Sequence, residues 1–263
     1  MTQLLKCKRR DAFRLSVRHN DSEDNFNPNL ILKHRLMTTI AQRLTLVRDR
    51  INTAAHASTR RIDQIQLVAV SKTQPVAAIA EAIAAGQMAF GENYLQEALP
   101  KITALVAHPL QWHFIGPIQR NKTADIAANF AWVHSVDRLS IAQRLNDQRP
   151  AGLSPLNICI QVNISQEDSK AGVAPTEVLT MAQTLSHLPR LRLRGLMTIP
   201  KPSADPVQQR TPLRQLRQLL EDINAQGLAL DTLSMGMSDD LEAAIGEGAT
   251  IIRVGTAIFG QRA

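Results

Sequence analysis

Short apolar runs alternate with helical patterns along most of this chain, and this alternation limits the fold more than any other feature. Eight runs are expected to be strands, at residues 65–70, 88–90, 111–115, 132–136, 156–163, 193–199, 232–235 and 251–254. An amphipathic or alanine-rich segment separates each run from the next. Strands that alternate with helices pair in parallel, and eight such units favour closure of the sheet. We therefore predict an α/β fold, a single (β/α)8 TIM-type barrel. An open, doubly wound sheet is the alternative.

A further helical pattern precedes the first expected strand. Apolar residues recur at Ile40, Leu44, Val47 and Ile51, which predicts an extra N-terminal helix. Residues 1–36 show no such pattern, and they hold eight Lys or Arg against four Asp or Glu. Without them the net charge falls from +7 to +3, since 22 basic and 19 acidic residues remain. We expect 1–36 to be a disordered basic extension and 37–263 to be the barrel domain.

Composition argues against several classes of protein. No apolar run reaches the ~18 residues that span a bilayer, so neither a membrane segment nor a signal peptide is expected. Cys7 and Cys159 lie far apart, which indicates neither a disulfide nor a zinc site and fits the cytoplasm. The basic cluster Lys6–Arg10 offers a nucleic-acid contact as an alternative function, but it lies in the extension, and we expect no nucleic-acid partner.

One lysine stands out among the polar residues that follow the expected strands. Functional groups of such barrels gather at the carboxyl ends of the strands. Lys72 occupies that place after the first strand, behind Val68 and Val70. Partial desolvation there favours the neutral amine, which can form a Schiff base with an aldehyde. A surface lysine just beyond a strand is the alternative interpretation.

The segments after the seventh and eighth strands are typical of anion binding. Ser238 is expected at the N-cap of a helix over 239–245, and Gly255-Thr256 follows the eighth strand. Exposed backbone N–H groups and hydroxyls in these places suit a phosphate. For Ser238 alone, an ordinary helix start is the alternative.

Two further residues have two interpretations each. Arg253 interrupts the apolar run 251–254, and a buried arginine needs either a structural ion pair or an acceptor such as a ring nitrogen. Asn93 follows the second strand, where it could bond a ligand oxygen or cap the next helix. His113 is expected to be a core histidine, and Tyr94 is the only tyrosine.

Six ordered motifs resemble the pyridoxal phosphate homeostasis proteins of the YggS/PROSC type. They are AVSKT at 69–73, FGENY at 90–94, WHFIG at 112–116, RGLM at 194–197, MGMSDD at 235–240 and RVGTAIFG at 253–260. The resemblance covers 37–262 and implies a fold-type III barrel, like the N-terminal domain of alanine racemase, with pyridoxal 5'-phosphate (PLP) as cofactor. It implies the following roles: Lys72 as the Schiff-base lysine, Asn93 beside the ring, Arg253 near the pyridine nitrogen, and Ser238, Gly255 and Thr256 at the phosphate. Position 74 is Gln, where some members carry a second lysine.

The resemblance also implies a role in PLP homeostasis. Such proteins carry or regulate PLP without an established reaction, so we expect a non-catalytic monomer that passes PLP to apo-enzymes. The alternative is a PLP-dependent enzyme similar to amino-acid racemases. Those enzymes add a C-terminal β-domain that supplies a tyrosine as second base, and this chain ends at Ala263. Only Tyr94 or His113 could then serve the second face of the ring.

Overall fold

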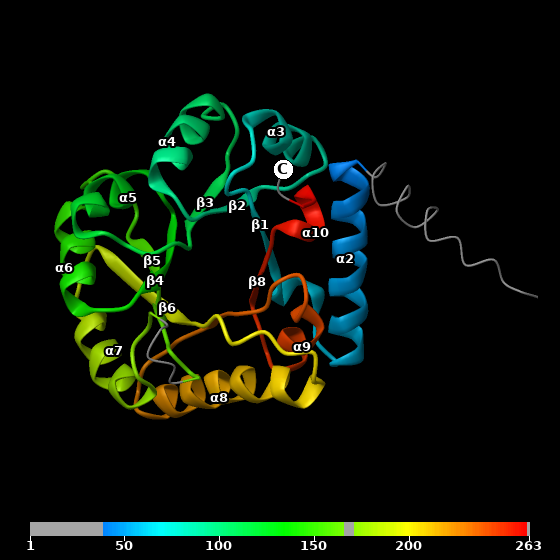
Figure 1. Cartoon of the computed structure of the whole chain (residues 1–263). Coiled ribbons are helices and arrows are strands. Elements are labelled where there is room, and N and C mark those ends of the chain that lie inside the picture. The colour runs from blue at the N-terminus through cyan, green and yellow to red at the C-terminus, as the bar shows by residue number, and fades with distance from the viewer. Residues whose placement is uncertain (1–38, 166–170, 262–263) are drawn as a thin grey trace, which may run out of the picture. The chain divides into compact units, whose positions relative to one another are not determined.

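Eight parallel strands form a closed barrel in chain order, with β8 pairing back onto β1 (Figure 1). This computed structural model describes residues 39–165 and 171–261. The strands are β1 Gln66–Val70, β2 Ala89–Glu92, β3 Gln111–Phe114, β4 Trp132–Val136, β5 Leu156–Gln161, β6 Leu191–Met197, β7 Thr232–Ser234 and β8 Ile251–Val254. The predicted (β/α)8 barrel is thereby confirmed, and the open sheet is excluded.

Helices surround the barrel (Figure 1). They are α2 Ile40–Ala57, α3 Val76–Ala84, α4 Leu95–Ala104, α5 Thr123–Asn129, α6 Leu139–Gln148, α7 Val178–Ser186, α8 Pro206–Ala225, α9 Leu241–Gly246 and α10 Thr256–Phe259. Short 3-10 turns lie at Ile62–Gln64, Arg120–Lys122 and Pro175–Glu177. No helix in the described part of the chain is long and apolar enough to cross a membrane.

The predicted N-terminal helix is α2, and it packs on the outside of the barrel against α3, α9 and α10 (Figure 1). It begins with a capping box, in which the Thr39 hydroxyl accepts from the Gln42 N–H and the Gln42 side chain accepts from the Thr39 N–H. Its apolar side, which includes Leu44, Val47 and Ile51, is buried. The predicted extension 1–36 lies outside the described residues.

Successive strand residues point alternately outward and inward, and this alternation separates two apolar clusters. The outward residues pack under the helices, as Ala69, Phe90 and Ile158 do. A smaller cluster fills the inside of the barrel with Val68, Ala89, Trp132, Cys159, Met197 and Ile251. Polar side chains share this interior, and the candidate site is built on them.

The structure corrects some element boundaries. The helix expected over 212–226 begins at Pro206, and Pro212 lies inside it. Asp205 caps this helix by accepting from the Val207 N–H at 2.8 Å, and the fixed φ of Pro206 suits the first helical position. The sixth strand spans 191–197 instead of 193–199.

Candidate functional site

Lys72 lies at the carboxyl end of β1, in a tight turn at the end of the barrel that we call the mouth. The Gln74 N–H donates to the Ser71 carbonyl at 3.0 Å and closes the turn. Thr73 within it has a φ of 63°, in the left-handed region that few side chains adopt. Its N–H donates to the Glu97 carboxylate at 2.9 Å, which holds that conformation. Lys72 itself is half-buried, so its aliphatic part lies against protein.

A buried ion pair holds the residue directly before Lys72. Lys101 on α4 donates to the Glu92 Oε1 atom at 2.9 Å and to the Ser71 carbonyl at 2.9 Å. The Ser71 hydroxyl donates to the same Glu92 oxygen at 2.6 Å. Burial raises the pKa of the Glu92 carboxyl, although the bonds from Ser71 and Lys101 favour its charged form. We call Ser71, Glu92 and Lys101 the β1 anchor.

The sequence prediction did not include this β1 anchor. Glu92 carries the only available signal, because it is a charged residue directly after Gly91, at the end of an expected buried strand. Lys101 gives no signal, since a lysine on an amphipathic helix is normally on the solvated face. Here it is 6% exposed.

Asn93 follows β2 at the same end of the barrel. It is half-buried, and its Oδ1 atom is buried without a hydrogen-bond partner in the described part of the chain. Its backbone carbonyl passes close to Gly116, where an added Cβ would lie 2.0 Å from the Asn93 oxygen. The adjacent Tyr94 is 50% exposed. A buried amide oxygen without a partner is costly, which suggests that a bound group supplies a donor there.

Arg253 points into the barrel from β8 and is 4% exposed. It donates to the Ser234 hydroxyl at 2.6 Å and to the Thr198 carbonyl at 3.0 Å. No carboxylate of the described residues lies within ion-pair distance of it, although the charge of Asp240 acts favourably on the guanidinium from farther away. Burial lowers the pKa of this guanidinium to about 10. Buried cations are normally paired, and an acceptor on a ligand would provide a further hydrogen-bond partner at the guanidinium itself.

The Arg253 guanidinium is connected to two histidines through Ser234. Nδ1 of His134 lies 2.7 Å from the Ser234 hydroxyl, and its Nε2 lies 2.9 Å from Nδ1 of His113. Burial lowers the pKa of His113 to about 3 and that of His134 well below its ordinary value. Both rings are therefore neutral at neutral pH. The prediction of a core histidine at position 113 is confirmed, and its ring stacks on Trp132 at 5.6 Å.

Ser238 and Gly255 follow neighbouring strands, β7 and β8. The two chains remain adjacent beyond the strands, because the Arg253 N–H donates to the Gly236 carbonyl at 3.0 Å. Ser238 is half-buried and Thr256 is exposed. Thr256 begins α10, a short helix that the sequence prediction did not include. The first N–H groups of a helix have no acceptor within it, so α10 presents donors after β8.

The predicted N-cap role of Ser238 is wrong. The helix expected over 239–245 is α9, which begins at Leu241 with Asp240 at its N-cap position. The Asp240 carboxylate accepts from the Met237 N–H at 2.6 Å and bends the chain into a turn before the helix starts. Ser238 lies in that turn.

Two glycines let the backbone close around the mouth. Gly236 has a φ of +93°, and an added Cβ would lie 2.5 Å from the Cβ of Ala244 on α9. At Gly255 an added Cβ would lie 3.3 Å from the Val70 carbonyl oxygen of β1. These close approaches bring the ends of β7, β8 and β1 together, and with them Ser238, Gly255 and Lys72.

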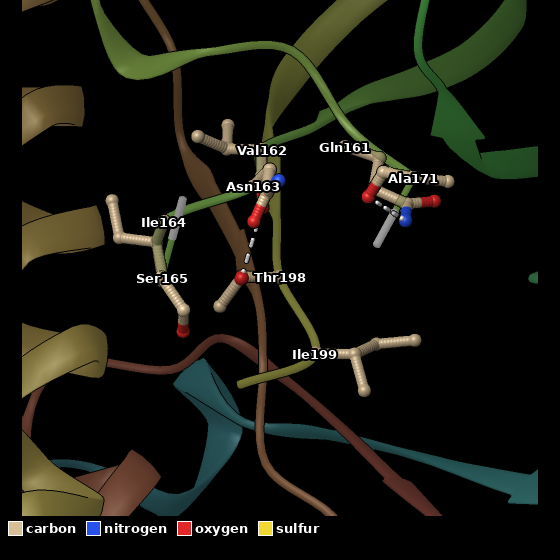
Figure 2. Close-up of a pocket in the computed structure, with 8 residues that line it drawn as sticks. All are labelled: Gln161, Val162, Asn163, Ile164, Ser165, Ala171, Thr198 and Ile199. Carbon is tan, nitrogen blue, oxygen red and sulfur yellow. Dashed lines mark hydrogen bonds between the residues drawn. The ribbon is translucent and has the colours of Figure 1, made fainter. Parts of the chain in front are cut away.

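A cavity of about 260 Å³ lies beyond the carboxyl ends of β5 and β6 (Figure 2). Its lining includes Gln161, Asn163, Ser165, Thr198 and Ile199. The Thr198 hydroxyl donates to the Val162 carbonyl at 3.0 Å, while the Thr198 carbonyl accepts from Arg253. Thr198 thus lies between this cavity at the mouth and the buried guanidinium of Arg253.

A second cavity, of about 490 Å³, lies at the opposite end of the barrel, where β1, β4, β7 and β8 begin. It holds none of the residues predicted for the site. Arg194 stacks over Trp132 there at 5.0 Å and pairs with Asp231 at 2.7 Å. These contacts tie β4, β6 and the start of β7 together, and we regard this end as structural.

The barrel and its mouth define a known class of protein. A family model described as alanine racemase, N-terminal domain, matches residues 44–263. A pyridoxal phosphate homeostasis protein of Pseudomonas aeruginosa is 60% identical over 226 residues, which cover 86% of this chain and 97% of that protein. One from Escherichia coli is 52% identical over 229 residues, or 86% of this chain and 98% of that protein. The chain belongs to the family of pyridoxal phosphate homeostasis proteins.

Solved structures agree with this assignment. PipY of Synechococcus elongatus with PLP bound is 37% identical, has a TM-score of 0.75, and is matched over 84% of this chain and 100% of PipY. The PLP-free form of PipY is 39% identical, with a TM-score of 0.76 and the same coverage. An alanine racemase of Clostridium difficile has a TM-score of 0.66 over 81% of this chain and 57% of the enzyme. At 13% identity, that match shows a common fold alone.

Proposed function

We propose that this chain binds PLP at the barrel mouth and serves PLP homeostasis as a carrier or regulator. The names of the relatives and the PLP-bound form of PipY support the cofactor. Recipient apo-enzymes, a monomeric state and a cytoplasmic location belong to the proposal. The thiol of Cys159 is buried and forms no disulfide within the part of the chain that the structure describes, which is consistent with a reducing compartment.

The observation that carries this proposal is the buried Arg253, which has no carboxylate of the described residues within ion-pair distance. A pyridine nitrogen is a neutral acceptor, and it would receive a hydrogen bond from the guanidinium without a second charge being buried. An arginine beside this nitrogen disfavours its protonation. The ring then withdraws electrons weakly, which suits a carrier better than an enzyme that forms carbanions.

The remaining residues fit the other parts of the cofactor. The Asn93 amide, with its buried and unpartnered oxygen, would lie beside the ring. The Ser238 and Thr256 hydroxyls and the backbone around Gly255 would hold the phosphate, helped by the close approach that the glycines permit. When bound, PLP would supply an aldehyde, and Lys72 would supply the amine that reacts with it.

The β1 anchor has a role in this arrangement. Lys101 and Glu92 fix the carbonyl and hydroxyl of Ser71, so the backbone beside Lys72 has little freedom. A lysine on a fixed turn presents its amine from a defined direction. The β1 anchor thus orients Lys72, and this role requires no proton transfer by its residues.

We propose that the chain binds PLP without catalysing a reaction of its own. Racemisation needs an acid or base on each face of the ring. Tyr94 is 50% exposed, and the ring of His113 lies on Trp132 inside the barrel. Neither position favours the racemase alternative. Exchange of an amino acid's α-proton with deuterated water, lost in Lys72→Ala, would instead establish an enzyme.

A spectroscopic titration tests the binding proposal. PLP added to the apo-protein is expected to give a visible absorbance band that free PLP lacks, and Lys72→Ala should abolish it. Lys201→Ala is the matched control, because Lys201 is exposed and lies outside the site. A wild-type protein that takes up no PLP would contradict the proposal.

A further inference from the structure

Three arginines of α2 reach from outside the barrel to backbone carbonyls of its neighbours. Arg43 donates to the Ile258 carbonyl at 2.6 Å, Arg48 to the Ala85 carbonyl at 2.9 Å, and Arg50 to the Ser238 carbonyl at 2.9 Å. All three side chains are half-buried. The Ile258 and Ser238 carbonyls belong to the segments proposed for the phosphate, and the Ala85 carbonyl does not.

Arg50 holds the turn that contains Ser238. Its Nε and Nη2 atoms bind both oxygens of Glu242 on α9, at 2.7 and 2.9 Å, which fixes the plane of the guanidinium. The same Nη2 donates to the Ser238 carbonyl. In a trans peptide, the carbonyl and the next N–H point in opposite directions. With the Ser238 carbonyl held toward α2, the Asp239 N–H is directed away from α2.

Arg43 holds α10 at its C-terminal end. The Ile258 carbonyl belongs to the last turn of this four-residue helix, and its N-terminus begins at Gly255 and Thr256. A helix this short does not keep its conformation by itself. A charged bond to its C-terminal carbonyl fixes its direction, and therefore the direction of the N–H groups at its start.

We infer that Arg43 and Arg50 are positioning residues for the phosphate of the cofactor. Each one fixes one of the two backbone segments at the phosphate from behind, and neither is placed to touch the ligand. The inference rests on the proposed function, since it takes the Ser238 and Gly255–Thr256 segments as the phosphate site. It gives the outer helix α2 a role in cofactor binding that the proposed function does not include.

Arg48 provides a matched control on the same helix. It carries the same charge, is equally half-buried, and also donates to a carbonyl at the C-terminal end of a helix, α3. Substitution of Arg48 therefore reproduces the loss of charge and of one carbonyl bond. It leaves the segments at Ser238 and Gly255 untouched.

The test compares PLP with pyridoxal, which lacks the phosphate. Dissociation constants for both are measured on the full chain for wild type, Arg43→Met, Arg50→Met and Arg48→Met, with inorganic phosphate as a competitor. Loss of one charge-assisted bond should weaken PLP binding about tenfold in Arg43→Met and in Arg50→Met. Pyridoxal binding should be unchanged in both, and Arg48→Met should keep the wild-type preference for PLP.

Two results would overturn the inference alone. One is a wild-type preference for PLP that persists in Arg43→Met and Arg50→Met. The other is a loss of that preference in Arg48→Met as large as in the other two. A wild-type protein that binds pyridoxal as tightly as PLP would instead overturn the proposed phosphate site, and the inference with it.

Conservative variants keep the test informative if a methionine variant does not fold. Lysine retains the charge but lacks the planar fork that lets Arg50 bind Glu242 and Ser238 together. Arg50→Lys should lose part of the preference for PLP, and Arg48→Lys should not. Equal preference in Arg50→Lys, Arg48→Lys and wild type would contradict the role given to Arg50.

Discussion

The Nζ atom of Lys101 lies 2.9 Å from the carbonyl oxygen of Ser71, the residue directly before Lys72. Lys101 lies on a helix, 30 positions after Ser71 in the sequence. A lysine in such a place would not normally be sought at this site, yet here it fixes the turn that carries the candidate amine. This contact links the stability of the barrel to the geometry of its mouth.

The first prediction concerns this buried pair. Lys101→Met leaves the Glu92 carboxylate buried without its cation, and we expect the free energy of unfolding to fall by about 3–5 kcal/mol. Urea unfolding of the apo-protein measures the change. Lys101→Met combined with Glu92→Gln should recover much of the loss, because the stranded charge is gone. A single variant as stable as wild type would contradict the role given to the β1 anchor.

The second prediction concerns pH. The folded pKa of His113 is about 3, below the ordinary value of 6.5. Between these values the unfolded chain binds a proton that the folded chain does not, so stability falls as the pH falls below about 6.5. His113→Asn should remove up to about 1.4 kcal/mol per pH unit of this dependence in that window. Unfolding measured from pH 7 to 5 gives the slopes, and the exposed His108→Asn is the control. Identical slopes in wild type and His113→Asn would contradict the prediction.

The third prediction concerns the glycine between β7 and α9. Gly236→Ala is expected to destabilise the fold by about 1–3 kcal/mol, because φ is +93° and the new Cβ would lie 2.5 Å from that of Ala244. Gly152 is the matched control, since an added Cβ meets no atom within 4 Å there. Thermal unfolding compares the two alanine variants. Similar melting temperatures for both would show that the close approach at Gly236 is unimportant.

The fourth prediction separates binding from folding at Arg253. Arg253→Leu should weaken PLP binding about tenfold through the lost hydrogen bond. The fold should lose no more than about 2 kcal/mol, since the variant removes a buried charge but leaves the Thr198 carbonyl without its donor. Fluorescence titration and urea unfolding give the two quantities. Unchanged PLP affinity would show that the guanidinium does not face the ring.

The barrel could be predicted from the sequence because each of its strands is marked by a local pattern of residues. Strands buried on both faces appear as short apolar runs, and β4 and β8 were predicted with their observed bounds. Ends set by side chains were harder to predict. The Asp240 carboxylate folds back to Met237 and delays α9, so Ser238 lost its predicted N-cap role. A choice between capping residues two positions apart depends on a turn that composition does not encode.

The predicted site residues came together at the mouth, while their supporting partners could not be predicted. Lys72, Asn93, Ser238 and Gly255 each follow a strand, so the barrel topology alone places them at one end. The partners of Arg253 lie on other strands, and β-register decides which side chains meet inside the barrel. Lys101 and Arg50 reach the site from helices, at long sequence separations that no local pattern reveals.

The central claim is that Lys72 holds PLP, and trapping the bound cofactor tests it most directly. The PLP-loaded full chain is reduced with borohydride and digested, and the modified peptides are located by mass spectrometry. We predict one phosphopyridoxyl group, on Lys72, and no stable modification in Lys72→Ala. A modification located on another lysine in the wild-type protein, with Lys72 unmodified, would contradict the account.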